Sequence, residues 1–197
     1  KDNKAIIYRY YQSRNSKYIK PFINGFKGWL QTDEYPGYET AIKEHNLLYP
    51  DDKIIHVAEQ ESNDLSKAFR YCRSKNYENV VILGATGKRE DHTLGNLSLL
   101  ALYAEELPNI KMITDHGEFF VIFHGGTFPS VKGEQISIIS LDSELVIRNS
   151  ENLKYPVKDL KLRYWYQATL NEALADNFSL DFDGHHPVLI YRAAKLK

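Results

Sequence analysis

The chain has 197 residues, enough to bury a hydrophobic core in one domain or in two small ones. It is 43% hydrophobic and 26% charged, as expected of a globular protein, and its net charge of −1 excludes a general electrostatic attraction to nucleic acid or anionic membranes. No apolar run approaches the roughly 20 residues of a membrane span. The single cysteine, Cys72, excludes an internal disulfide and favours a reducing compartment, so we expect a cytoplasmic protein without membrane contacts.

Residues 1–57 alternate between short apolar runs typical of strands and segments with helical spacing. A β-α-β-α-β pattern of this kind predicts parallel strands joined by right-handed crossovers. The expected strands are Ala5–Tyr10, Gly28–Gln31 and Lys53–Val57, and the expected helices are Lys17–Asn24 and Gly37–His45.

A strand, a glycine turn and a helix are predicted in the middle of the chain. The apolar run Val80–Leu83 indicates a short buried strand, and Gly84 and Gly87 after it suit a turn that approaches a ligand through its backbone. From Asp91 onward the spacing predicts a helix that stops before Pro108. Its apolar positions are Leu94, Leu97, Ala101 and Ala104.

The charged residues at the start of this helix are compatible with a phosphate site. Free N–H groups and the positive end of the helix dipole favour an anion, and Lys88 and Arg89 add positive charge. Asp91 suits either a Mg²⁺ ligand or a helix cap, so a plain capped turn is the alternative interpretation.

A second helix is predicted just upstream, because Ser62, Asn63 and Asp64 are common helix-start residues. Asp64 can act as a metal ligand or as a partner of the helix dipole. Cys72 shares an apolar stripe with Leu65, Ala68 and Phe69, which indicates a buried thiol and not a nucleophile.

Residues 110–197 read as short strands separated by turn residues, a pattern that favours an antiparallel sandwich. We therefore expect an α/β fold: a parallel-sheet βα domain built from residues 1–57 and 58–109, followed by an all-β sandwich over residues 110–197. The expected strands of the sandwich are Lys111–Thr114, Glu118–His124, Gln135–Leu141, Glu144–Arg148 and Pro187–Ala193, with further alternation at Phe178, Leu180 and Phe182.

Short polar motifs follow one another after residue 58. They are Glu59–Asp64 (EQESND), Gly84–Asn96 (GATGKREDHTLGN), Asn152–Pro156 (NLKYP) and Thr169–Glu172 (TLNE). In this order they resemble the D-Q-x-x-T-D, G-x-x-G-x-R-x-D-H/Q-x-x-x-N, G-L-x-Y-P and S-N-E segments of the thiamine pyrophosphokinase family. Asn63 stands where that family usually has Thr, and Leu170 stands where it usually has Ser.

The resemblance implies transfer of a pyrophosphoryl group from ATP to the hydroxyl of thiamine, with Mg²⁺, in a homodimer with composite sites. Matching positions imply catalytic roles for Gln60, Asp64, Arg89 and Asp91, and metal binding by Asp64 and Asp91, joined by Asp33. They imply ATP contacts from Gly84, Thr86, Gly87, Lys88 and Arg89, and thiamine contacts from Trp165, Thr169 and Asn171. For Trp165, packing in the core is the alternative.

The N-terminal segment departs from that family, whose D-G-G-A and G-D-x-D-S loops are missing here. Instead, Phe26–Tyr38 (FKGWLQTDEYPGY) resembles the F-K-G-x-L-Q-T-D-G-Y-x-G-Y segment of insertion-sequence transposases with a DDE catalytic domain. The resemblance implies that Asp33 matches one of their three metal-binding acids. One acid does not support transposition, so we expect no transposition chemistry. The two resemblances together imply a chimera, in which a transposase fragment is joined near Val57–Ala58 to a kinase without its own first strands.

Two alternatives to a working kinase stay open. The chain can be a catalytically impaired module that binds nucleotide or thiamine, or a transposase fragment that binds DNA through its basic N-terminal stretch. Only residues 1–57 favour DNA binding, so nucleic acid is not the expected partner.

Overall fold

The computed structural model describes residues 5–7, 29–30, 57–59, 61–86, 89–184 and 186–194. The chain divides into two compact units, Lys1–Asn96 and Leu97–Lys197. The expected helices Lys17–Asn24 and Gly37–His45 lie outside the described residues, as does all but the last residue of the expected strand at 53–57. The expected domain boundaries after residues 57 and 109 stay predictions.

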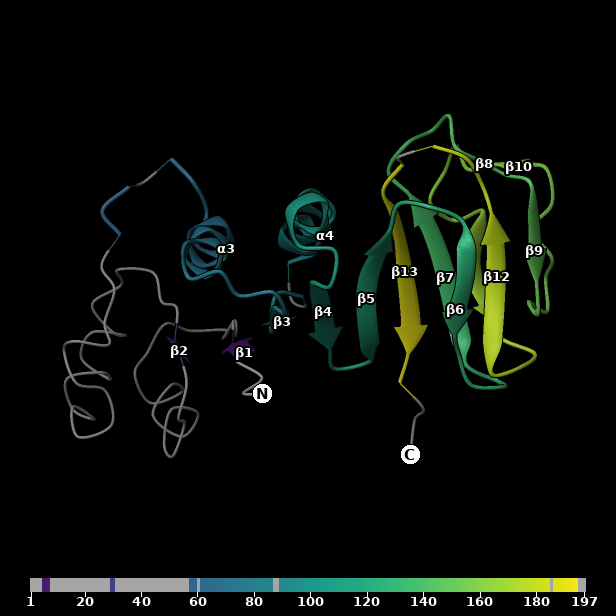
Figure 1. Ribbon diagram of the computed structural model, residues 1–197, viewed down its shortest axis with the longest axis horizontal. Coiled ribbons are helices and arrows are strands. Elements are labelled where there is room, and N and C mark those ends of the chain that lie inside the picture. Colours follow the sequence, from purple (N-terminus) through teal and green to yellow (C-terminus); the bar gives the residue numbers. More distant parts are fainter. Residues whose placement is uncertain are drawn as a thin grey trace. The chain divides into compact units, whose positions relative to one another are not determined.

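Among the described residues of the first unit, the parallel strands (Figure 1) are β1 (Ala5–Ile7), β2 (Trp29–Leu30) and β3 (Val81–Leu83). Strand β1 lies between the other two, with Ile6 paired to both Trp29 and Ile82. The parallel arrangement expected from the β-α-β pattern of residues 1–57 is confirmed for β1 and β2. Since β1 and β2 come from the transposase-like segment, that segment contributes strands to the sheet that contains β3.

Helix α3 (Asp64–Ser74) begins where the sequence predicts. Asn63 is its N-cap, and the Asn63 side chain accepts a hydrogen bond from the backbone N–H of Ser66 at 2.8 Å. The buried face matches the predicted stripe and consists of Leu65, Ala68, Phe69 and Cys72. Burial raises the pKa of the Cys72 thiol to about 11, so the thiol stays neutral, as expected of a packing residue.

Helix α4 (Glu90–Glu106) begins one residue before the predicted start and ends before Pro108. Leu97, Ala101 and Ala104 are buried as expected. Leu94 is 49% exposed, so its place in the buried stripe was predicted wrongly. It lies near the start of α4, about one turn before Leu97.

The second unit is an antiparallel β-sandwich, as predicted. One sheet has the strand order β11-β7-β13-β5-β4, with every adjacent pair antiparallel. Its strands are β4 (Lys111–Thr114), β5 (Gly117–Ile122), β7 (Gln135–Ser140), β11 (Ala168–Glu172) and β13 (Val188–Ala193).

The smaller sheets supply the other side of the sandwich. Strand β12 pairs with β6 and β9, and β8 pairs with β10, again antiparallel. Four of the unit's strands, β6, β9, β10 and β11, were not among the expected ones, and β8 is shorter than expected. The bounds are β6 (Gly126–Pro129), β8 (Val146–Ile147), β9 (Asn149–Glu151), β10 (Leu160–Lys161) and β12 (Asn177–Asp181).

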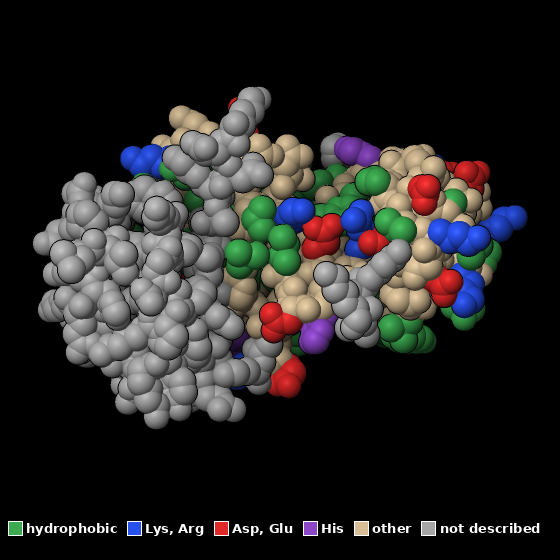
Figure 2. Space-filling view, turned by 90° about the horizontal axis from the view of Figure 1, so that it is seen from below, with side chains coloured by type: hydrophobic (Ala, Val, Ile, Leu, Met, Phe, Trp, Pro, Cys, Tyr) green, Lys and Arg blue, Asp and Glu red, His purple; other side chains and the backbone are tan. Residues whose placement is uncertain are grey.

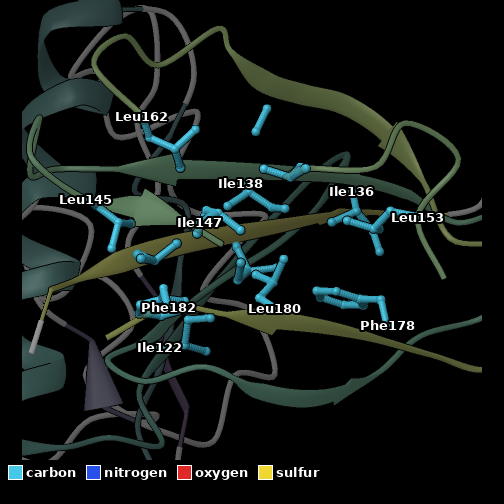
Figure 3. Close-up of a cluster of buried hydrophobic side chains, with 14 of the residues drawn as sticks. Ile122, Ile136, Ile138, Leu145, Ile147, Leu153, Leu162, Phe178, Leu180 and Phe182 are labelled. Atoms are coloured by element: carbon cyan, nitrogen blue, oxygen red, sulfur yellow. The ribbon is translucent and has the colours of Figure 1, made fainter. Parts of the chain in front are cut away.

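The core of the sandwich is a single cluster of apolar side chains (Figure 3). Ile136 and Ile138 of β7 and Phe178 and Leu180 of β12 point into it, and each is at most 2% exposed. Alternate residues of each strand face this core, because side chains alternate across a strand. Burial of each such side chain contributes on the order of 2 kcal/mol. All residues of the cluster belong to the second unit, which therefore has a hydrophobic core of its own.

Charged side chains of both signs are interspersed on one face of the molecule (Figure 2). In the second unit, Glu118 forms ion pairs with Lys111 at 2.9 Å and with Arg192 at 3.3 Å. Among the described residues, no helix has the length and apolar character to cross a bilayer.

Candidate functional site

The turn after β3 starts with a glycine in a left-handed conformation. Gly84 has φ = +69°, which a residue with a side chain rarely adopts. The carbonyl of Ala85, the next residue, accepts a hydrogen bond from the side-chain amide of Asn96 at 2.7 Å. Asn96 is buried on α4, so it ties the turn back to the helix that follows. No role was predicted for Asn96 from the sequence, although it is the last residue of the Gly84–Asn96 motif.

Arg89 is positioned at the beginning of α4. Its carbonyl accepts hydrogen bonds from the backbone N–H of Thr93 at 3.2 Å and from the Thr93 hydroxyl at 3.3 Å. The N–H groups of the first helical turn have no partner within the helix, and the helix dipole is positive at this end. The start of α4 therefore has the electrostatic character of an anion-binding site.

Arg89 and Asp91 form a bidentate ion pair at this helix start. The Arg89 Nε and Nη2 atoms donate to Asp91 Oδ1 at 3.0 Å and Oδ2 at 2.5 Å. The side chains are 58% and 62% exposed. The hydrogen bond from Arg89 lowers the pKa of Asp91, so the carboxylate is ionised at neutral pH and open to solvent.

Asp64 lies at the start of α3. It is the first residue of the helix, its side chain is 23% exposed, and its carboxylate lies 3.9 Å from Lys67 Nζ. In an α/β unit the helices run antiparallel to the parallel strands, so helix N-termini gather at the edge where the strands end. By this rule we expect the starts of α3 and α4 and the Gly84 turn to share one edge of the sheet, and this shared edge stays a prediction.

The chemistry of the two carboxylates is compatible with Mg²⁺. Oxygen ligands suit this ion, which commonly uses one or two carboxylates and completes its coordination with substrate phosphates and water. The described residues contain no group of three or more His, Cys, Asp or Glu side chains that could hold a metal ion by themselves. The donors fit a metal–phosphate complex better than a free-standing metal site. Asp33, Gln60, Gly87 and Lys88 lie outside the described residues.

The second unit exposes four aromatic side chains, called here the aromatic surface: Tyr155, Tyr164, Trp165 and Tyr166. Trp165 is 44% exposed, so it does not pack in the core, which was the alternative interpretation. The rings of Tyr164 and Tyr166 stack at a centroid distance of 6.3 Å. Leu170 is also exposed, because a β-bulge in β11 holds it at φ = +57°.

Asn171 is 2% exposed and holds the loop that contains Tyr155. Its Oδ1 accepts from the backbone N–H of Tyr155 at 3.0 Å, and its Nδ2 donates to the Tyr155 carbonyl at 2.7 Å. Thr169, on the same strand, donates its hydroxyl to the Tyr166 carbonyl at 2.9 Å. Both residues therefore support segments of the aromatic surface. Direct contact of Thr169 or Asn171 with a ligand stays a prediction.

Family models match most of the chain. Residues 40–112 match the catalytic domain of thiamin pyrophosphokinase, and residues 117–191 match its substrate-binding domain. Residues 1–58 match the transposase IS66 family. The transposase match and the catalytic-domain match overlap from residue 40 to residue 58, near the expected join.

Individual relatives agree with these matches. Thiamin pyrophosphokinase 1 of Caenorhabditis elegans is 27% identical over 122 residues, and thiamine pyrophosphokinase of Bacillus subtilis is 30% identical over 109 residues. These alignments cover 57% and 53% of this chain, and the chain spans about half the length of each of these relatives, 50% in both cases.

Solved structures share the fold. The thiamine pyrophosphokinase structure from Bacillus subtilis superposes with a TM-score of 0.73 at 18% identity, covering 98% of this chain and 99% of that one. The structure from Geobacillus thermodenitrificans gives a TM-score of 0.70 at 21% identity, covering 91% and 84%. The α/β fold followed by a β-sandwich is therefore a known combination.

Proposed function

We propose that this chain, which belongs to the thiamine pyrophosphokinase family, transfers a pyrophosphoryl group from ATP to thiamine. The observation that carries the proposal is the turn that joins β3 to the start of α4. There a left-handed glycine, an anion-binding helix terminus and the exposed Arg89–Asp91 pair occur within eight residues. This is the arrangement that binding of a metal-complexed triphosphate requires.

The reaction breaks one bond and forms one. The thiamine hydroxyl oxygen attacks the β-phosphorus of ATP, the bond from this phosphorus to the oxygen of AMP breaks, and the hydroxyl proton goes to solvent. Such a transfer depends on positioning and charge neutralisation. Arg89 and Lys88 offset charge on the phosphate oxygens, and Gln60 orients a phosphate or the attacking hydroxyl. The backbone of Gly84, Thr86 and Gly87 approaches the phosphates.

Asp64 and Asp91 would hold Mg²⁺, joined by Asp33. The metal ion, when bound, neutralises the triphosphate charge and favours departure of AMP. Asp33 follows the last residue of β2, Leu30, by three positions, and the carboxyl ends of parallel strands meet at one edge of a sheet. This supports Asp33 as a substitute for the acidic loops that the N-terminal segment lacks.

The aromatic surface would bind thiamine. An exposed indole such as Trp165 can stack on the cationic thiazolium or on the pyrimidine ring. Thr169 and Asn171 would act at the same place, through direct contact or through the segments that they hold. We propose a homodimer in which the sandwich of one copy closes the site of the other.

A second function has its own support. Residues 1–58 match the transposase family, and the two acidic loops expected of the kinase family are missing. Loss of metal ligands costs orders of magnitude in reactions of metal-complexed phosphates. The chain would then bind nucleotide or thiamine without turnover.

A turnover assay separates the two functions. Purified protein is incubated with ATP, Mg²⁺ and thiamine, and AMP and thiamine diphosphate are quantified by chromatography. Equal amounts of both products, dependent on thiamine, support the kinase. Folded protein that binds ATP or thiamine by calorimetry and forms neither product supports the binding module.

A further inference from the structure

Glu59 organises the segment that leads into α3. Its Oε1 accepts from the backbone N–H of Ser62 at 2.6 Å, and its Oε2 accepts from the Ser62 hydroxyl at 2.5 Å. The Ser62 hydroxyl, assisted by the positive charge of Arg70, lowers the pKa of Glu59, so the side chain is an ionised acceptor at neutral pH.

Arg70, in the second turn of α3, connects the helix to this segment. Its Nη2 donates to Glu59 Oε2 at 2.9 Å and also to the hydroxyl of Ser62. The segment is therefore held at its first residue, Glu59, and at its last, Ser62, by one arginine. Gln60 lies between these two in the sequence, and Asp64 follows two residues after Ser62.

This network is not needed to start the helix. Asn63 already caps α3 through the N–H of Ser66, and the carbonyl of Asn63 accepts from the N–H of Lys67 at 3.1 Å. Nor is it a large source of stability, because the Arg70 and Glu59 side chains are 58% and 38% exposed and exposed ion pairs contribute little. What the three hydrogen bonds to Glu59 do fix is the path of the backbone before Asp64.

We propose that Glu59 and Arg70 are positioning residues, which hold the backbone before Asp64 in the conformation that presents the Asp64 carboxylate to the metal-complexed triphosphate. The inference rests on the proposed kinase function. Neither residue contacts a substrate in this account: both act through Ser62 and the backbone. A small displacement of reacting groups is known to cost large factors in rate, so loss of a weak surface pair can be kinetically large.

The variants Glu59→Gln, Arg70→Met and the double variant test this. Both single changes remove the charged hydrogen bond with little change in size. We expect kcat to fall about tenfold in each, with no further fall in the double variant, because both remove one interaction. The KM for thiamine and the urea midpoint stay as in the unmodified protein. Glu59→Asp keeps a carboxylate and introduces the aspartate of the family motif, so its kcat should be higher than that of Glu59→Gln.

Arg73→Met is the matched control, since Arg73 is an exposed arginine in the last turn of the same helix. It should leave kcat unchanged. Equal kcat values for Glu59→Gln, Arg70→Met and the unmodified protein would overturn the inference, as would a fall that is matched by Arg73→Met. A loss of rate that follows a loss of folded protein in urea would assign the pair to stability instead.

Amide hydrogen exchange keeps this test separate from the proposed function. If the unmodified protein forms no thiamine diphosphate, the kinase proposal fails, and the exchange rate of the Ser62 N–H decides the inference. Faster exchange at Ser62 in Glu59→Gln and in Arg70→Met, with unchanged exchange in β7, supports the held segment. Unchanged exchange at Ser62 overturns it.

Discussion

The Arg89 guanidinium donates to both carboxylate oxygens of Asp91, two residues further along the chain. Arg89, proposed to bind a phosphate, and Asp91, proposed to bind Mg²⁺, thus neutralise each other in the ligand-free protein. Binding of the metal–ATP complex would exchange this contact for two new ones, Arg89 to phosphate and Asp91 to metal. The pair keeps both side chains at the start of α4 until that exchange.

Asp91→Asn should abolish turnover and leave the fold intact. The substitution removes the negative charge that would hold the metal, and we expect a fall in kcat of about 100-fold or more. Because Asp91 is 62% exposed, the urea midpoint should stay as in the unmodified protein. Steady-state kinetics and urea unfolding measure the two quantities. Asp115→Asn, in the exposed turn between β4 and β5, is the control. Near-normal rates in Asp91→Asn would remove Asp91 from the mechanism.

Trp165→Ala should raise the KM for thiamine about tenfold while the KM for ATP stays unchanged. The reason is that stacking of a cationic ring on an indole contributes roughly 1–2 kcal/mol. The control is Val131→Ala, an exposed apolar residue of the same unit outside the aromatic surface. If both KM values respond equally, or if neither responds, the aromatic surface does not bind thiamine.

Asn171→Ala should destabilise the sandwich by about 2–3 kcal/mol. The change leaves the partly buried N–H and carbonyl of Tyr155 without the partners that Asn171 provides. Urea unfolding of the variant measures the loss. Asn177→Ala removes one exposed hydrogen bond, which Asn177 Oδ1 accepts from Asn152 Nδ2. This change should cost less than about 0.5 kcal/mol of the free energy of unfolding. Similar values for the two variants would mean that Asn171 does not hold the Tyr155 loop.

Cys72 should make the protein less stable at high pH. Burial raises the thiol pKa from 9.0 to about 11, so the folded state binds the proton more tightly than the unfolded state. The stabilisation is complete below the unfolded pKa and is lost as pH rises from about 9 toward 11.

The test compares urea unfolding at about pH 8 and about pH 10 in the unmodified protein and in Cys72→Ala. The cavity in the variant costs the same at both pH values, so a smaller pH effect in Cys72→Ala isolates the thiol. Equal pH effects in the two proteins would show that Cys72 does not titrate in this way.

Elements with a long periodic pattern could be predicted from the sequence. Helices α3 and α4 have apolar residues at helical spacing, and strands β5, β7 and β13 are rich in apolar residues. Helix α4 and these three strands each lie within two residues of their predicted ends. Strand β11 was missed because the bulge at Leu170 interrupts its alternation. Strands β6 and β9 contain Gly, Pro and Asn and form through pairing with β12, which a local pattern does not reveal.

The candidate site divides in the same way. The Gly84 turn, Arg89 and Asp91 could be predicted because their chemistry depends on residue type and spacing within one segment. The roles of Asn96 and Asn171 could not, since each holds a backbone group that lies 11 or 16 residues away in the sequence. A polar residue in a motif can support the site without contacting the ligand. Only the contacts in the structure distinguish such a supporting residue from one that binds the ligand.

The most direct measurement follows the β-phosphorus. Purified protein is incubated with Mg²⁺, thiamine and ATP labelled at the β-phosphate, and the labelled products are separated by chromatography. Pyrophosphoryl transfer predicts that the label appears in thiamine diphosphate, with one AMP formed for each molecule of product. Label that appears in ADP or in free pyrophosphate, or folded protein that yields no labelled thiamine diphosphate, would contradict the proposed kinase function.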